Sequence, residues 1–224
     1  MISIIIPIYN EEKNIIKIQD NLLKLKGDFE VIFCDGGSSD KTIELIDDGY
    51  TVLNSPKGRG NQMNYGSEFA KGDILFFLHC DSIIEEDALM KIQKTVDKGF
   101  QVGCLKIEFD NSIIWMRICG IMSNLRSKVT KIAFGDQGIF IKKELFDKMN
   151  GMPKLPIMED FEFSLRLRRR KHYIKQIDSK IITSARRFTD KGILKTMYQM
   201  QKFQIQYLCG KNIDEINKEY RDIR

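Results

Sequence analysis

The sequence predicts an α/β fold with a mostly parallel central sheet and helices on both faces. Strand-like apolar runs alternate with helical patterns along the first half of the chain. The most continuous run, residues 74–78, is apolar at each position, as in a strand that is buried on both faces. Acidic residues follow two of the runs, at Asp35 and Asp81, where open α/β sheets bind ligands.

Composition narrows the function classes. The chain has 224 residues, enough for one sizeable core, and its net charge of +5 suits anionic partners such as nucleotide phosphates or a membrane surface. This excess is too small to indicate nucleic acid, and no nucleic-acid-binding motif is present. No apolar run reaches the roughly 20 residues of a membrane span, and the N-terminus has no secretory pattern. We expect a cytoplasmic protein, with peripheral contact at the inner face of the membrane left open.

The five cysteines are scattered and include no C-x-x-C pair, so the sequence predicts neither a disulfide framework nor a zinc cluster. A zinc site built from His79, Cys80 and His172 is a weak alternative, because its spacing matches no standard pattern.

The first strand is expected over residues 2–6. Pro7 should end it, because proline cannot donate to a strand ladder. Asn10 is a suitable N-cap for the helix that follows, and Gly27 should close that helix.

A second strand at residues 30–34 runs into Asp35 and a glycine-rich turn that begins at Gly36. A short helix over residues 42–46 should follow. Strand, acidic turn and helix in this order are typical of a nucleotide site, although no dinucleotide fingerprint is present.

A short third strand at residues 50–53 leads into a basic loop, residues 54–60, in which Lys57 and Arg59 suit a phosphate. Asn61 or Gln62 should open the next helix. The central strand then runs into Asp81, which is expected to hold a divalent cation against a phosphate or, alternatively, to cap the following turn.

The second half changes character. Alternation over residues 105–110 predicts a strand with one solvent-facing side. Residues 113–122 form an apolar patch that contains Trp115, the only tryptophan, and predict either a core helix or a surface that contacts lipid or acceptor. The remaining expected elements are strands at 139–141, 173–177 and 181–183 and helices at 144–149, from Met158, at 192–208 and at 212–224.

Two charged pairs in this half carry possible chemistry. Glu159 and Asp160 open a helix, and the helix dipole accounts for one of these acids more readily than for both. Arg186 and Arg187 precede Phe188 and could clamp a diphosphate, although an ordinary solvated pair is the commoner case.

In their order and spacing, five motifs resemble a family-2 glycosyltransferase of the GT-A fold. The motifs are Ile6-Pro7-Ile8-Tyr9-Asn10-Glu11, Asp35-Gly36-Gly37-Ser38-Ser39-Asp40-Lys41-Thr42, His79-Cys80-Asp81, Gly135-Asp136-Gln137-Gly138 and Glu159-Asp160. Residues 58–64 and 183–188 look like a compact subgroup of short bacterial members whose substrates are poorly defined.

The resemblance implies an inverting transfer of a sugar from a nucleotide-diphosphate donor to an acceptor hydroxyl. The acceptor could be a lipid, a glycan or a small molecule. Donor contacts are then expected from residues that include an acid, Asp35, on the base or ribose; the full set is Pro7, Tyr9, Glu11, Asp35, Gly36, Arg59, Gln62, Arg186 and Arg187.

The resemblance also assigns the reacting groups. Asp81 matches the last acid of the family's D-x-D metal motif, so Mg²⁺ or Mn²⁺ is the implied cofactor. His79 replaces the first acid and either assists the metal or is a core histidine. Asp160 matches the general base, with Glu159 beside it.

By the same resemblance, residues 1–188 form a GT-A catalytic domain, with a nucleotide-binding half at 1–110 and an acceptor half at 111–188. Residues 189–224 form a helical extension that packs on this domain or lies at a membrane surface. Two other functions stay open: a nucleotidyltransferase and a non-catalytic nucleotide-sugar-binding protein. The first would need a basic glycine-rich loop after the first strand, where this chain has residues 7–10 instead.

Overall fold

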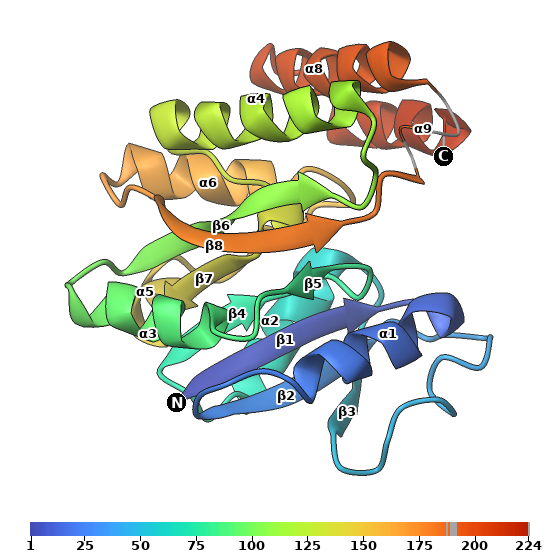
Figure 1. Cartoon of the computed structure of the whole chain (residues 1–224). Helices are drawn as coiled ribbons and strands as arrows, with labels where there is room; N and C mark the ends of the chain where they lie inside the picture. The colour runs from blue at the N-terminus through green and yellow to red at the C-terminus, as the bar shows by residue number, and fades with distance from the viewer. Residues whose placement is uncertain (187, 189–191, 224) are drawn as a thin grey trace.

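The computed structural model describes residues 1–186, 188 and 192–223 (Figure 1). Within this part of the chain the sheet has eight strands in the order β3-β2-β1-β4-β7-β6-β8-β5. The strands are β1 (Ile2–Ile8), β2 (Phe29–Asp35), β3 (Thr51–Asn54), β4 (Ile74–Phe77), β5 (Ile83–Ile84), β6 (Val102–Phe109), β7 (Ile139–Lys142) and β8 (Lys175–Thr183). The predicted α/β class is confirmed.

One half of the sheet is parallel. The strands β3, β2, β1 and β4 share one direction, and Ile4 of β1 lies between Val31 of β2 and Phe76 of β4. These side chains are buried, which explains why this half appears in the sequence as continuous apolar runs. Asp35 ends β2 and Asp81 follows β4, so both acids come at the carboxyl ends of parallel strands, as predicted.

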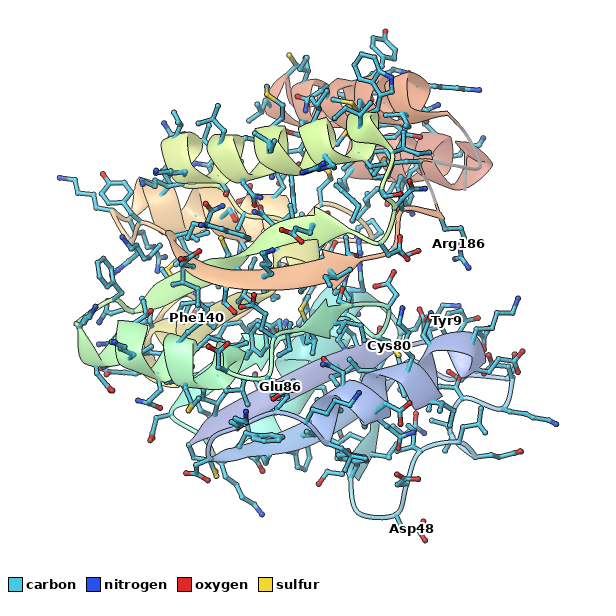
Figure 2. The ribbon with its side chains drawn as sticks, viewed as in Figure 1. Tyr9, Asp48, Cys80, Glu86, Phe140 and Arg186 are labelled. Atoms are coloured by element: carbon cyan, nitrogen blue, oxygen red, sulfur yellow. The ribbon has the colours of Figure 1, made fainter. Side chains whose placement is uncertain are left out.

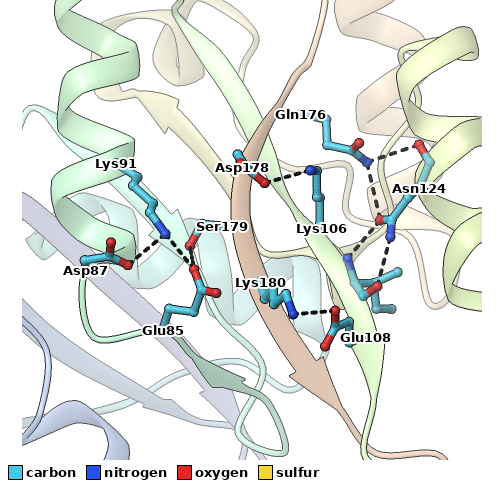
Figure 3. A network of polar contacts seen from close by, with 11 residues as sticks. Glu85, Asp87, Lys91, Lys106, Glu108, Asn124, Gln176, Asp178, Ser179 and Lys180 are labelled. Carbon is cyan, nitrogen blue, oxygen red and sulfur yellow. Dashed lines mark hydrogen bonds and ion pairs between the residues drawn. The ribbon is translucent and has the colours of Figure 1, made fainter. Parts of the chain in front are cut away.

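The other half is mixed. The strand β7 is antiparallel to β4 and β6, whereas β6 and β8 are parallel. Ion pairs cross between β6 and β8, with Lys106 Nζ 2.7 Å from Asp178 and Lys180 Nζ 2.9 Å from Glu108 (Figure 3). The predicted solvent-facing side of residues 105–110 is confirmed.

Helices cover both faces of the sheet. On one face lie α1 (Glu12–Leu22) and α3 (Ala88–Asp97), whose Ile18 and Ile92 belong to the same core as Phe76. On the other lie α2 (Arg59–Phe69), α5 (Lys143–Lys148) and α6 (Glu159–Arg169), whose Met63, Phe146 and Phe163 pack with Phe77. The two cores bury most of β1, β2 and β4 from both sides.

A third group of helices lies beyond β6 and β8 (Figure 1): α4 (Ile114–Thr130), α8 (Ile193–Leu208) and α9 (Ile213–Ile223). Phe203 of α8 and Ile216 of α9 pack with Ile157 and Phe161. The C-terminal helices therefore contact the segment that leads into α6. Of the apolar patch at residues 113–122, only Met116, Cys119 and Gly120 are buried, so this helix is largely a surface element.

The helix predicted over residues 42–46 is wrong, because these residues form turns. The side chain of Gln19 donates to the carbonyl of Leu45 and accepts from the backbone N–H of Asp47. These bonds to α1 replace the bonds by which a helix would have continued.

Five element boundaries also differ from the prediction. The helix α2 begins at Arg59, before the predicted Asn61 or Gln62. The strand β1 continues through Pro7, since its pairing with β4 ends at Ile5 and the missing N–H costs nothing there. Asn10 is not an N-cap: it has φ 54° and accepts from Ser39. The helix α1 ends at Leu22, before Gly27. The two strands predicted near 173–177 and 181–183 are one strand, β8.

Candidate active site

A cleft of 520 Å³ opens at the carboxyl ends of β1 and β4. It brings together residues from strands far apart in sequence with the start of α2 and with α9. Its described lining is Pro7, Ile8, Tyr9, Glu11, Lys57, Gly58, Arg59, Gln62, His79, Cys80, Asp81, Pro156, Ile157, Asn217 and Tyr220. Seven residues predicted to hold the donor or metal are in this list: Pro7, Tyr9, Glu11, Arg59, Gln62, His79 and Asp81.

An aromatic ring and an ammonium group form one part of the cleft. Lys57 Nζ lies 3.7 Å from the centroid of the Tyr9 ring, and Tyr9 as a whole is 40% exposed. An aromatic face next to a cation can stack a base and attract a phosphate. Lys57 was noted in the sequence as a phosphate-suited residue, and the structure adds its contact with Tyr9.

Gln62 fixes the floor of the cleft. Its Nε2 donates to the carbonyls of Ile8 and Cys34, each at 2.7 Å, and the residue is 3% exposed. These two carbonyls belong to the adjacent strands β1 and β2. The side chain thus stabilises the site's framework, and both of its N–H groups are already used.

Three predicted donor residues, Asp35, Gly36 and Arg186, lie outside the described lining of the cleft. The carboxylate of Asp35 accepts from the backbone N–H groups of Gly37 and Ser38 and from the hydroxyl of Ser38. Gly36 lies against the side chain of Gln62. In the described structure, Asp35 orders its own turn.

Arg186 lies near the same edge of the sheet. Figure 2 shows Tyr9, Cys80 and Arg186 on the side toward which the arrows of β1 and β8 point. The backbone N–H of Arg186 donates to Ser184. Its predicted partner Arg187 falls outside the residues that the structure describes.

A second cavity, of 220 Å³, meets the first at shared residues, among them Arg59, His79 and Asp81. Its described walls are largely aromatic or aliphatic: Phe109, Phe134, Ile157, Met158, Phe188, Met200 and Phe203. Its polar lining includes three carboxylates, those of Asp81, Asp136 and Asp160. The geometry therefore gives two adjacent chambers, one polar and one mostly apolar, with Asp81 where they meet and Asp136 and Asp160 in the second.

Asp160 is held in place by backbone groups. The N–H of Gly135 donates to Oδ2 at 2.7 Å, and the N–H of Phe161 donates to Oδ1 at the same distance. A Cβ atom at Gly135 would lie 2.7 Å from Nε2 of His79 and 3.4 Å from Oδ2 of Asp160. Only glycine allows this close approach, so the Gly135 turn sets the spacing between the imidazole and the carboxylate.

Glu159 has a different environment from its neighbour. It is 2% exposed, and its Oε1 lies 2.8 Å from Nε of Arg59. Burial raises the pKa of Glu159, and Arg59 opposes that rise. Burial lowers the pKa of Arg59, but the carboxylates of Glu159 and Asp160 outweigh it and raise the pKa overall. Glu159 therefore positions Arg59 between the two chambers.

Asp136 and Arg126 carry buried atoms without partners among the described residues. Oδ1 of Asp136 and Nη1 of Arg126 are both buried and make no hydrogen bond there. Burial, and then Asp160, raise the pKa of Asp136 to about 6. Arg126 lies 3.9 Å over the Phe134 ring and donates to Gln137. Because unpaired buried charges are costly, these atoms mark a polar spot that a ligand or water can satisfy.

The donors present are compatible with a divalent cation at Asp81. Burial lowers the pKa of His79, and Arg59 lowers it further, so the imidazole is neutral and has a lone pair to give. Among residues 1–186, 188 and 192–223, no three His, Cys, Asp or Glu side chains are grouped to hold a metal. A cation here would take its remaining ligands from a substrate, as Mg²⁺ does with phosphates.

The same finding bears on the zinc alternative, because His79, Cys80 and His172 form no such group in the described structure. The cysteines at 34, 80, 104 and 119 are buried, as small apolar residues would be, whereas Cys209 is exposed. No helix among the described residues is long and apolar enough to cross a membrane.

Several lining residues were not among those predicted from the sequence. Asn217 and Tyr220 come from α9, and Met200 and Phe203 come from α8. Their sequence signal was only helical periodicity, which does not say where a helix docks. Asp136 lies in a motif that had been noted, but its unpartnered oxygen depends on tertiary packing.

Known proteins resemble this chain in sequence. The family model described as Glycosyl transferase family 2 matches residues 3–173. A curated relative, the undecaprenyl-phosphate 4-deoxy-4-formamido-L-arabinose transferase of Photorhabdus laumondii, is 25% identical over 155 residues, covering 63% of this chain and 48% of the relative. The chain thus spans about half the length of the curated relatives it matches.

Two solved structures share the fold. Glucosyl-3-phosphoglycerate synthase from Mycobacterium tuberculosis, in complex with Mn²⁺, UDP and glucosyl-3-phosphoglycerate, has a TM-score of 0.65 at 18% identity and covers 94% of this chain and 79% of that one. A mannosyltransferase from Pyrobaculum calidifontis, in complex with GDP-Man and Mn²⁺, has a TM-score of 0.64 at 17% identity, covering 81% and 56%.

Proposed function

This chain belongs to glycosyl transferase family 2 and has the GT-A fold, and on that premise we propose that it moves a sugar from a nucleotide-diphosphate donor to an acceptor oxygen with inversion at the anomeric carbon. The observation that carries the proposal is the meeting of two chambers at Asp81, with Asp160 in the wall of the second. The match favours sugar transfer over nucleotidyl transfer.

The donor occupies the polar cleft. Its base lies by Tyr9, and its diphosphate lies toward Lys57 and Arg59, which supply positive charge. Relatives of the same fold were crystallised with UDP or GDP-Man, which supports a nucleotide in this position. Mg²⁺ or Mn²⁺ held by Asp81, with His79 beside it, would neutralise charge on the departing diphosphate.

Asp160 is the proposed general base. It lines the second chamber, and its carboxylate is fixed by two N–H donors while its oxygens retain further lone pairs. The base takes the proton from the acceptor hydroxyl, the acceptor oxygen bonds to the anomeric carbon, and the bond from that carbon to the diphosphate breaks. The electron pair of the broken bond leaves with the nucleoside diphosphate.

The acceptor enters through the second chamber. The aromatic and aliphatic side chains in its walls suit an acceptor that carries an apolar part. The curated relatives are named for transfer to undecaprenyl phosphate, a lipid, which is consistent with such walls. Asp136, whose buried oxygen has no partner among the described residues, is placed to bind a polar group of the acceptor.

Thermal stabilisation by UDP, GDP, CDP and dTDP, each with and without Mn²⁺, tests this proposal. A ligand that binds only the folded state raises its stability by mass action. We expect one diphosphate to raise the melting temperature in a Mn²⁺-dependent way in wild type and in Asp73→Ala, but not in Asp81→Ala. Asp73 is an exposed acid at the opposite end of the same strand, and so serves as the matched control. No shift with any of the diphosphates would contradict the donor assignment.

A further inference from the structure

The surface helix α4 exposes an unusually apolar side. It buries Met116, Cys119, Gly120 and Ser127 against the fold. Six large apolar side chains lie on its other side, each more than half exposed, and we refer to them as the α4 stripe: Ile114, Trp115, Ile121, Met122, Leu125 and Val129. At 3.6 residues per turn, their spacing confines them to roughly one third of the helix circumference.

The charge around the α4 stripe has one sign. The 17 residues of α4 include Arg117, Arg126 and Lys128 and no acid. The 16 residues of the neighbouring α8 also contain no acid, although the whole chain has 31. Arg117 and Lys128 are exposed. By helical spacing, both follow the same edge of the stripe.

An apolar stripe with a basic edge matches the physics of an interfacial helix. Such a helix buries its apolar side at the level of the lipid headgroups, while its basic residues attract anionic lipids. Trp115, which is 56% exposed, has the amphipathic ring that prefers this region. We propose that the α4 stripe docks this protein on the surface of an anionic lipid bilayer.

A second copy of the chain is a poorer occupant. In a two-fold symmetric dimer the same patch meets itself, so the bases of one helix would face the bases of the other. With no acid on α4, that arrangement brings like charges together, which is unfavourable. An anionic bilayer supplies the opposite charge and accepts the apolar side chains.

Docking through α4 would also orient the site. Sγ of Cys119 lies 3.3 Å from Sδ of Met197, so α4 and α8 are in contact. Met200 and Phe203 of α8 line the second chamber. The docked surface and this chamber therefore share a helix. If the proposed transfer holds, a lipid-borne acceptor would have a short route to the chamber, but the docking itself needs no transfer activity.

The full-length chain offers a direct optical test, because Trp115 is its only tryptophan. We expect its emission to shift to the blue with vesicles of phosphatidylcholine containing roughly one third phosphatidylglycerol, and the protein to float with them. Vesicles of phosphatidylcholine alone should bind more weakly, and added salt should weaken binding to the anionic ones. Replacing Arg117 by alanine should reduce partitioning about fivefold, the effect of one basic residue near the surface.

Matched variants separate the stripe from general hydrophobicity. Ile121→Glu should abolish the blue shift and the flotation, whereas Leu23→Glu, at a 74% exposed position just after α1, should leave both unchanged. Both variants should keep the wild-type melting temperature, since neither side chain is buried. No binding to anionic vesicles, or equal losses in the two variants, would overturn the proposal. The proposal would also be overturned if the protein bound no lipid and instead formed a dimer that Ile121→Glu dissociates.

Discussion

Removing Arg59 should leave the buried carboxylate of Glu159 without its ion-pair partner. The burial of this carboxylate determines how far the free energy of unfolding falls. Glu159 is 2% exposed and pairs with Arg59 at 2.8 Å. In Arg59→Met the carboxylate loses this partner and stays desolvated, which costs about 3–5 kcal/mol in the free energy of unfolding. Glu159→Gln should lower the free energy of unfolding by less. The side chain of Arg59 is 44% exposed, so water can hydrate it when the Glu159 carboxylate is gone.

The double variant Arg59→Met/Glu159→Gln should recover about 1–3 kcal/mol relative to the sum of the single losses, since no unpaired charge is left. The pH dependence has a defined sign. Burial raises the pKa of Glu159, so the stability linked to its protonated form is lost as pH rises. Without Arg59 that pKa rises further. The loss in Arg59→Met should therefore be larger near pH 7 than near pH 5.

Urea unfolding of the three variants at both pH values measures these quantities. Arg169→Met is the matched control, because Arg169 pairs with Glu162 at the surface and is 65% exposed, so its removal should cost under about 1 kcal/mol. If Arg59→Met costs no more than this control, or if its effect is independent of pH, Glu159 is not a buried charge held by Arg59.

Three further changes test the surrounding geometry. Gln62→Leu should lower the free energy of unfolding by about 1–3 kcal/mol, because two buried carbonyls lose the Gln62 donor, although that of Ile8 keeps the N–H of Gly36; a loss under about 0.5 kcal/mol in urea unfolding would contradict that role. Asp136→Asn should stabilise the metal-free protein near pH 7 by up to about 3 kcal/mol and have no effect near pH 4, because the pKa of about 6 lies above its usual range and stability is lost as pH rises through it. An equal effect at both pH values would refute this. Gly135→Ala should lower kcat by displacing His79 and Asp160, while a matched Gly49→Ala, with open space around the new methyl, should not; unchanged kcat in Gly135→Ala would refute the tight spacing.

The parallel half of the fold was predictable because burial on both faces requires apolar residues at each position. This is visible at residues 2–6 and 74–78. The helix expected at residues 42–46 was not borne out, because Gln19, distant in sequence, bonds the backbone of Leu45 and Asp47. Local helix propensity does not depend on contacts between residues distant in sequence, so it could not exclude this helix.

Some residues of the candidate site could likewise be predicted from the sequence, and others could not. Asp81 was found from the residues because the carboxyl ends of parallel strands meet at one edge of a sheet, whereas Tyr9 and Gln62 were implied by the family resemblance. Asn217 and Tyr220 could not be predicted as lining residues, since they reach the cleft only through the docking of α9.

The central claim is that Asp160 removes the acceptor proton while other residues hold the donor. The most direct test is the rate of nucleoside diphosphate release from the identified nucleotide-sugar in the presence of acceptor, with donor affinity measured in parallel, for Asp160→Asn and for the exposed control Asp147→Asn. We expect Asp160→Asn to lower kcat by about 10²–10⁴-fold with donor affinity close to wild type, and the control to match wild type in both. Wild-type kcat in Asp160→Asn would remove this carboxylate from the reaction and contradict the account.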